Sequence, residues 1–193
     1  MYKNFDIDNI AETVKCLLKE LGEDVNRPGL EETPQRAAKM FAEMLEGMLY
    51  SNDEIAEMFG KCFEHVQSDD MVIVKDIQIF SFCEHHFALM YNMRVHIAYI
   101  PQGKIIGLSK IARIADMVAK RFQLQERIGQ DIVYVMQKIL ETDDVMVVIE
   151  GEHSCMSARG IRAQGSKTRT NTLCGQFANG SDFVREVLIQ LQS

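Results

Sequence analysis

The 193-residue sequence lacks several features that would place a protein in a broad class at once. Its five cysteines are odd in number and too sparse for a disulfide scaffold, which favours a reducing compartment. No apolar run approaches the roughly 20 residues that a membrane-spanning helix needs. The first residues, MYKNFDIDN, contain no apolar core of the kind found in signal peptides. We therefore expect a cytoplasmic protein with no membrane partner.

Positive charge is also scarce, because 21 lysines and arginines face 28 acidic residues and give a formal net charge of −7. General nucleic-acid binding depends on a basic surface that displaces phosphate counterions, so we expect no nucleic-acid partner. The deficit is uneven: residues 1–82 hold 17 acidic and 8 basic side chains, and residues 83–193 hold 11 and 13. An anionic ligand is therefore expected to bind to the second part of the chain.

Hydrophobic periodicity predicts two helices at the start of the chain. Apolar residues at helical spacing indicate a helix over 10–21. Thr33 is predicted to be the N-cap of the next helix, with Pro34 at its first position. The apolar stripe of this second helix continues to Met48.

The rest of the chain alternates between strand and helix patterns. Alternating apolar residues predict a strand over 71–80 with a bulge near Lys75-Asp76, because the apolar parity shifts there. A helix is expected to begin at Ser109, and another to cover 125–141. The remaining predicted elements are strands over 91–100, 144–153 and 168–177 and a short closing helix.

The order of these elements favours an α+β fold. A strand pair, a helix pair and a second strand pair suit an antiparallel sheet better than a wound βαβ sheet. We expect an N-terminal helical segment over 1–66 and the main domain over 67–193, working as one functional unit.

The densest group of reactive side chains is CEHH at 83–86, in a predicted loop between two strands. Cys83 and His86 are three residues apart and can chelate one metal ion, and a thiolate with an imidazole suits zinc. Taken alone, this spacing fits a buried cysteine beside loop histidines equally well. A second group, Glu152 to Cys155, would supply a third ligand in Cys155.

Three protein ligands would leave zinc a fourth position for water, which is typical of catalytic rather than structural sites. Zinc would lower the pKa of that water towards about 7. His85 and His153 would remain free as proton carriers near neutral pH.

Basic residues indicate the substrate class. Ser109, Lys110 and Arg113 lie at a predicted helix N-terminus, where backbone N–H groups favour phosphate. Each of these side chains alone is more simply explained as solvated surface charge, but beside a metal they suggest a phosphorylated substrate. Further basic residues follow Cys155, namely Arg159, Arg162, Lys167 and Arg169. Gln125-Glu126 opens a predicted helix and would serve either the helix dipole or a guanine edge.

Four segments in order carry a family resemblance: CEHH (83–86), GLSKIAR (107–113), LQER (124–127) and EHSCMSARG (152–160). They resemble the motifs of GTP cyclohydrolase I, and GLEETPQR (29–36) and TRTNTLCGQF (168–177) also match. The family converts GTP and water to formate and 7,8-dihydroneopterin triphosphate, at the entry to folate-type pterins. The resemblance implies its tunnelling fold, a sheet with two antiparallel helices in each subunit.

The resemblance also implies roles for individual residues. Cys83, His86 and Cys155 would bind one Zn²⁺ per subunit, and the zinc-bound water would add to C8 of the guanine. His85 would protonate the ring nitrogen as the ring opens, and His153 would act as an acid/base near the ribose.

The substrate contacts are implied in the same way. The triphosphate would be held by Arg36, Lys110, Arg113 and Arg159. Ser109 would lie close to the ribose or the phosphates, and Gln125 and Glu126 would read the guanine. The active sites would lie between subunits of a homodecamer made of two pentameric rings.

Some features depart from the family or favour other readings. The segment FALMYNM at 87–93 lacks the proline and glycine that many members carry, and Cys174 stands where arginine is common, so we expect it to be a structural thiol. His65 and His96 match nothing catalytic, and His96 is expected to be hydrogen-bonded within its strand. A zinc deaminase usually needs C-x-x-C, which is absent. The remaining alternative is a non-catalytic nucleotide- or pterin-binding protein with a structural zinc.

Overall fold

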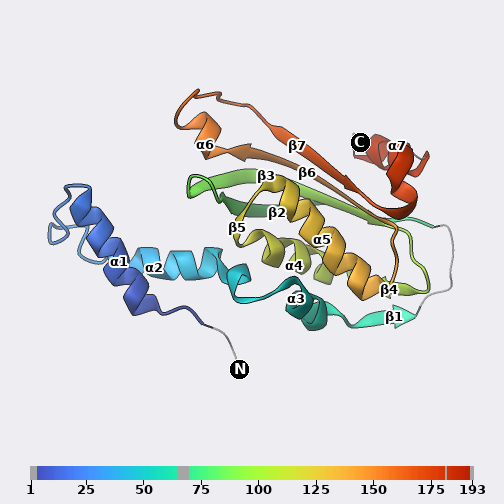
Figure 1. The fold of residues 1–193 in the computed structure, drawn as a ribbon, viewed down its shortest axis with the longest axis horizontal. Helices are drawn as coiled ribbons and strands as arrows, with labels where there is room; N and C mark the ends of the chain where they lie inside the picture. The colour runs from blue at the N-terminus through green and yellow to red at the C-terminus, as the bar shows by residue number, and fades with distance from the viewer. Residues whose placement is uncertain (1–3, 65–69, 181, 192–193) are drawn as a thin grey trace.

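The computed structural model describes residues 4–64, 70–180 and 182–191. His65 and the expected boundary between residues 66 and 67 lie outside the described residues. The chain is an α+β protein, as the sequence predicts, with a five-stranded sheet and a separate two-stranded one (Figure 1).

The helical elements are α1 (Ile7–Glu20), α2 (Thr33–Met44), the 3-10 helix η1 (Glu46–Leu49), α3 (Asn52–Phe59), α4 (Leu108–Ala119), α5 (Gln125–Leu140), α6 (Ser154–Ser157), the 3-10 helix η2 (Gly175–Gly180) and α7 (Asp182–Gln190). The strands are β1 (Cys62–Glu64), β2 (Val72–Cys83), β3 (Ala88–Tyr99), β4 (Lys104–Ile106), β5 (Phe122–Gln123), β6 (Val145–His153) and β7 (Thr168–Leu173).

The main sheet has the strand order β5-β2-β3-β6-β7, so the two predicted strand pairs meet at its centre. All neighbours are antiparallel except β2 and β5. The predicted bulge is confirmed, because the register of β2 against β3 shifts between Val74 and Ile77. Asp76 at this bulge has φ of 60°, and its backbone N–H donates to Nδ1 of His96 at 3.1 Å. His96 is thus hydrogen-bonded in its strand, as expected.

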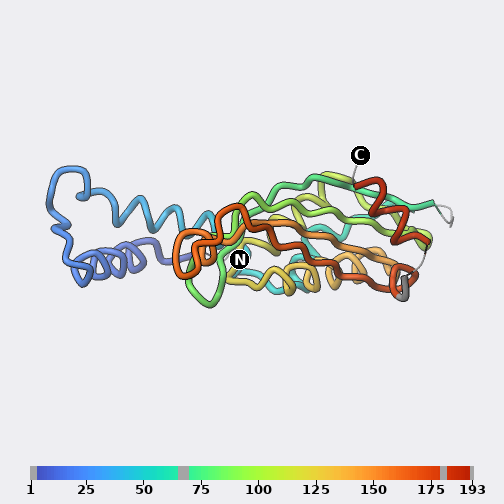
Figure 2. Tube along the Cα trace, turned by 90° about the horizontal axis from the view of Figure 1, so that it is seen from above, coloured from blue at the N-terminus to red at the C-terminus, as the bar shows by residue number. Residues whose placement is uncertain are grey.

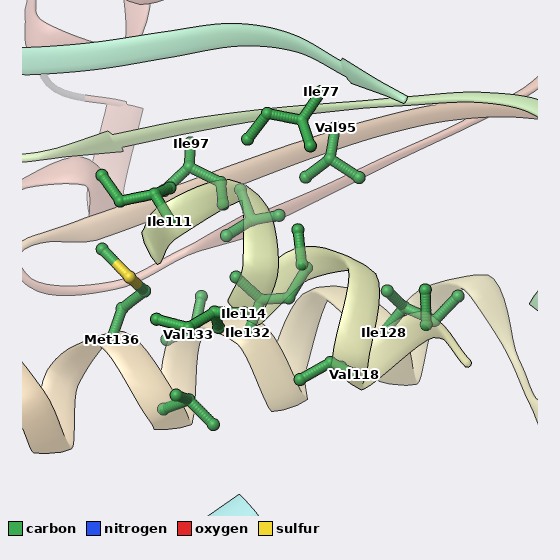
Figure 3. Close-up of a cluster of buried hydrophobic side chains, with 14 of the residues drawn as sticks. Ile77, Val95, Ile97, Ile111, Ile114, Val118, Ile128, Ile132, Val133 and Met136 are labelled. Carbon is green, nitrogen blue, oxygen red and sulfur yellow. The ribbon is translucent and has the colours of Figure 1, made fainter. Parts of the chain in front are cut away.

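Helices α4 and α5 cover one face of the main sheet and enclose the principal core (Figure 3). The helices are antiparallel, since the Cys62 thiol donates to the carbonyl of Ile139 near the end of α5, while Cys62 pairs with Ile106 just before α4. The core side chains drawn and labelled are Ile77, Val95, Ile97, Ile111, Ile114, Val118, Ile128, Ile132, Val133 and Met136.

Strand alternation sends the intervening residues to the other face of the sheet. Ala98, Met146 and Val148 pack there against Phe177 of η2 and Val187 of α7. The predicted closing helix therefore covers the face opposite α4 and α5. None of the helices in the described part of the chain is long and apolar enough to cross a membrane.

The α1–α2 hairpin extends away from the sheet as an arm (Figure 2). The prediction that Thr33 is the N-cap of α2 is wrong: Glu32 holds that position, and Thr33 is already helical. The physical reason is a preceding turn, in which the Thr33 N–H donates to the carbonyl of Leu30. Without a capping role, the Thr33 hydroxyl donates back to the carbonyl of Gly29 at 3.4 Å.

The second helix also ends earlier than its apolar stripe indicates. It stops at Met44, and η1 follows. A Cβ atom on Gly47 would lie 2.0 Å from the carbonyl oxygen of Met117 and 2.9 Å from that of Lys120. The chain must therefore leave the helical path at η1 in order to pack its backbone against the end of α4.

Several short elements were not predicted, among them α3, β1 and β4, and one strand is shorter than expected. Strand β1 pairs with β4 in the separate two-stranded sheet, and α3 packs on α5, so these elements lie against α5 rather than in the arm. Strand β7 ends at Leu173 instead of 177, because Gly175 has φ of 57° and begins η2.

Candidate metal centre and active site

The predicted ligands Cys83, His86 and Cys155 converge at one end of the main sheet. Their ligand atoms all lie within 4.8 Å of one another, and the Cys83 sulfur is 4.0 Å from Nδ1 of His86. Ligands of one tetrahedral zinc ion would be about 3.5–3.8 Å apart, from the usual Zn–S and Zn–N lengths. Two thiols and an imidazole at this spacing can therefore hold such a metal with small side-chain adjustments.

The first two ligands are held by a tight turn at the end of β2. Cys83 is buried and pairs with Ala88 across the turn and with Gln123 of β5. The N–H groups of His86 and Phe87 both donate to the carbonyl of Cys83, at 3.4 and 3.0 Å. The imidazole of His86 is thereby folded back over the strand that carries the first thiol.

The third ligand comes from α6, immediately after β6. The Ser154 hydroxyl donates to the carbonyl of Leu89 at 2.7 Å, and the hydroxyls of Tyr91 and Ser157 lie 3.2 Å apart. These contacts fix α6 against β3, so that Cys155 faces the turn that follows β2. Burial raises the pKa of the Cys155 thiol, and the nearby Cys83 raises it further.

The two predicted proton carriers take different positions around the cluster. His85 is exposed, and its ring is nearly perpendicular to that of His86, at 83° with centroids 6.3 Å apart. His153 ends β6 and is partly buried, and this burial lowers the pKa of its imidazole. The neighbouring Glu126 carboxylate partly opposes that shift. His85 therefore lies outside the group of ligand atoms formed by Cys83, His86 and Cys155.

The two residues expected at a guanine differ in environment. Glu126 is exposed in the first turn of α5 and stands close enough to influence His153. Gln125 is only 1% exposed. Its amide nitrogen donates within the protein, and its Oε1 lies 2.9 Å from Nε2 of His153.

An ion pair that the sequence reasoning missed joins the CEHH and LQER segments. Arg127 donates from both terminal nitrogens to the Glu84 carboxylate, at 2.5 and 3.1 Å. The Arg127 hydrogen bonds hold the pKa of Glu84 below its usual range. No spacing rule links residues so far apart in sequence. Their presence in two motifs of the same family resemblance was the available signal.

The α4 residues lie at the other end of the sheet. The Lys110 ammonium donates to the carbonyls of Phe59 and Lys61, at 3.2 and 2.6 Å. Arg113 is exposed one turn further along. The end of α4 reaches the metal cluster through β5, so Lys110 is about 14 Å of helix away from it. Figure 1 shows β1 and β4 at the end of the sheet opposite α6.

Three of the remaining basic candidates, Arg159, Arg36 and Arg169, lie in different places. Arg159 is exposed just after α6 and close enough to Cys155 to lower the pKa of that thiol slightly, against the larger effect of burial. Arg36 lies on the arm and pairs with Glu32, with both side chains exposed. Arg169 pairs with Glu150 at 3.5 Å across β6 and β7. Only Arg159 among these three lies beside the metal ligands.

The unusual segment at 87–93 begins with a residue in the left-handed region. Phe87 has φ of 53°, and its ring packs 4.9 Å from Phe122 and 5.3 Å from Phe41, between ring centroids. The Phe41 contact joins α2 of the arm to the turn that carries His86. Aromatic packing thus occupies the place where many members of the resembled family carry proline and glycine.

Comparison with known proteins agrees with this geometry. The family model of GTP cyclohydrolase I matches residues 10–192. A protein of Clostridium botulinum (strain Loch Maree / Type A3) named GTP cyclohydrolase 1 is 58% identical over 177 residues, covering 89% of this chain and 90% of its own length. One of Clostridium acetobutylicum with the same name is 52% identical over 189 residues, covering 96% and 97%. The chain belongs to the GTP cyclohydrolase I family.

Proposed function

We propose that this chain hydrolyses and rearranges GTP to 7,8-dihydroneopterin triphosphate and formate, at a site centred on Cys83, His86 and Cys155. The observation that carries the proposal is the convergence of these ligand atoms within 4.8 Å, with an exposed His85 and a partly buried His153 beside them. The family membership of the chain agrees with this reaction.

The donor set fits Zn²⁺, one ion per subunit. Two thiolates and an imidazole leave a tetrahedral ion one open position, and a reducing cytoplasm would keep both thiols available. When bound, zinc supplies a Lewis acid and lowers the pKa of a coordinated water. The chain's own part is to present both sulfurs and Nδ1 of His86 from a rigid turn and from α6.

The two histidines would move protons. His85 has an exposed imidazole outside the ligand set, and we assign it the proton that the guanine ring nitrogen takes up as the ring opens. His153 would act during the later rearrangement near the ribose. Its lowered pKa keeps the imidazole neutral near pH 7, so it begins as an acceptor. The exposed Glu126 carboxylate would accept N–H groups from the guanine edge.

The triphosphate would be held by Arg36, Arg159, Lys110 and Arg113, with Ser109 near the ribose or phosphates. Lys110 lies about 14 Å of helix from the end of α4 that reaches the metal ligands of its own chain, and Arg113 about 9 Å, so one subunit does not gather all four cations at the metal. This separation supports a site shared between subunits. We propose a homodecamer of two pentameric rings, and a solution mass of a stable monomer would contradict it.

The test combines metal content with product identification. The purified protein should convert GTP to a product with the ultraviolet spectrum of a dihydropterin and release formate. Cys155→Ala should lose zinc and activity together, whereas His85→Ala should retain zinc and lose turnover. Full formate release by a chelated, zinc-free preparation would refute the proposal.

The alternative of a non-catalytic binding protein with a structural zinc is not favoured. A structural zinc is normally enclosed by four protein ligands, and among the described residues only three side chains form the cluster. Two further histidines stand beside it without binding the metal. A protein that binds GTP but forms no pterin would reverse this preference.

A further inference from the structure

The buried Gln125 and the partly buried His153 are hydrogen-bonded to each other beside the candidate metal ligands. Gln125 is the first residue of α5, and His153 is the last residue of β6. Oε1 of the glutamine lies 2.9 Å from Nε2 of the histidine. Two segments that both belong to the recognised motifs are therefore joined by one side-chain hydrogen bond.

The surroundings of Gln125 determine the positions of its amide oxygen and its amide nitrogen. Its Nε2 is 3.1 Å from the carbonyl oxygen of Ile149, 3.1 Å from that of Thr168 and 3.3 Å from the hydroxyl of Thr170. Backbone carbonyl oxygens only accept hydrogen bonds, so the atom that faces them must be the NH₂ group. The amide oxygen is consequently the atom directed at His153.

This orientation determines which ring nitrogen of His153 carries hydrogen. An amide oxygen has only lone pairs, so Nε2 of His153 must be the donor of their hydrogen bond. The neutral imidazole then has its lone pair at Nδ1. Within the described residues Nδ1 has no hydrogen-bond partner in the protein. That nitrogen is left for the substrate.

We propose that Gln125 is a positioning residue, which fixes the ring orientation and the tautomer of His153 and leaves Nδ1 as the nitrogen that meets the substrate. This inference rests on the proposed role of His153 in the GTP reaction. It also replaces the expectation that the Gln125 amide reads guanine. Both amide hydrogens face acceptors of the chain itself, and the oxygen already accepts from His153.

The packing around the pair supports a fixed rather than a mobile amide. Gly151 lies two residues before His153, and a Cβ atom at this position would stand 2.8 Å from Cγ of Met93 and 3.4 Å from Oε1 of Gln125. A side chain there would clash with Met93 and would touch the glutamine oxygen. The bare backbone of Gly151 leaves room for the Gln125 amide to reach His153.

The first test locates the hydrogen directly. Neutron diffraction from crystals of the deuterated wild-type protein should show deuterium on Nε2 of His153, and the ND₂ group of Gln125 directed at Ile149 and Thr168. A bare Nε2, or a reversed amide, would overturn the proposal. The neutron map does not depend on enzyme turnover. A protein that fails to convert GTP would therefore count against the proposed function but not against this hydrogen position.

The second test separates positioning from guanine recognition. Gln125→Met keeps the length of the side chain but removes the amide. We expect kcat to fall by about 10–100-fold, as for residues that orient a catalytic or metal-binding histidine, with KM for GTP nearly unchanged. Thr170→Val is the matched control, because it removes one contact to the amide nitrogen and leaves the contact to His153; its kcat should stay close to wild type.

Inosine triphosphate, which lacks the exocyclic amino group of guanine, provides the contrasting probe. The preference for GTP over inosine triphosphate should persist in Gln125→Met and weaken in Glu126→Gln. A raised KM with normal kcat, together with a lost preference in Gln125→Met, would instead make Gln125 a guanine-reading residue and refute the proposal. If Gln125→Met does not fold, the neutron map decides.

Discussion

Replacing Arg121 should weaken the attachment of the segment before α3 to the main sheet. Its guanidinium donates to the carbonyls of Gly47 and Tyr50, each at 3.0 Å, and to Oδ1 of Asn52 at 2.8 Å. It also pairs with the Asp131 carboxylate at 3.3 Å. The Arg121 side chain is only 15% exposed and that of Asp131 19%, so water replaces these contacts poorly.

The expected loss in the free energy of unfolding depends on which groups lose their partners in Arg121→Met. Methionine keeps the apolar stem, but two backbone carbonyls lose their charged donor. Asp131 retains neutral donors, the amides of Asn52 and Gln123, each at 2.9 Å. Removing one partner of a buried ion pair costs about 3–5 kcal/mol, and these remaining donors place the expected loss at the lower end, about 3 kcal/mol.

The assay is urea unfolding at one fixed subunit concentration, because association contributes to the stability of an oligomer. Amide hydrogen exchange should quicken first over residues 47–52, where the donors are lost. Lys138→Met is the matched control. It breaks the exposed pair with Asp53 and should change stability little, because solvent screens both charges. If Arg121→Met were no more destabilising than Lys138→Met, the reasoning would be refuted.

Two further substitutions test the packing and the pH response of the fold. Gly47→Ala should lower stability by about 1–3 kcal/mol, because its new Cβ would meet the backbone oxygens of Met117 and Lys120; an unchanged melting temperature would contradict that contact. Burial lowers the pKa of His96, so the unfolded chain takes up its proton first, and the free energy of unfolding should fall as pH drops below about 6.5. His96→Asn keeps an acceptor for the Asp76 N–H without titrating, and should make the free energy of unfolding less dependent on pH below about 6.5; equal slopes in both proteins would exclude this contribution.

Strong periodicity made most of the main sheet predictable. The apolar parity of β2 shifts where the bulge forms, because a bulge reverses the faces of all later residues in the strand. Helices α4 and α5 were predicted for the same reason, since each buries a continuous apolar stripe. The apolar residues that predict each of these elements are therefore the residues that become buried in the core.

The missed elements are short or stabilised by distant partners. Strand β1 has three residues and exists through pairing with β4, some 40 residues later, which no local pattern reveals. Helix α3 did carry a signal: Ser51 and Glu54 form a capping box, with the Ser51 hydroxyl accepting from the Glu54 N–H. The wrong prediction of Thr33 as an N-cap has a different cause. Threonine is a common capping residue, but the turn before α2 starts the helix one residue earlier, so Thr33 lies inside it.

The residues of the candidate site were also predictable only in part. Residue chemistry and spacing predicted Cys83, His86 and Cys155 as candidate metal ligands, and the structure brings their ligand atoms together. The partners of the proposed proton carriers were not predictable. The burial of Gln125 depends on the backbone carbonyls of Ile149 and Thr168, which carry no signal in the residue letters.

The distribution of charge bears on how such a site binds a triphosphate. The metal end of one chain presents Arg159 together with the acidic Glu126, whereas Lys110 lies in the first turn of α4 and Arg113 in the middle of this helix. A ligand with about four negative charges is held best by several cations within a Debye length of roughly 8 Å, so the cations of α4 would add to those at the metal end. Head-to-tail contacts that close into a ring would bring the α4 end of one subunit to the metal end of the next. If the proposed assembly forms in this way, triphosphate affinity should depend on it, whereas the candidate metal ligands Cys83, His86 and Cys155 all come from one chain.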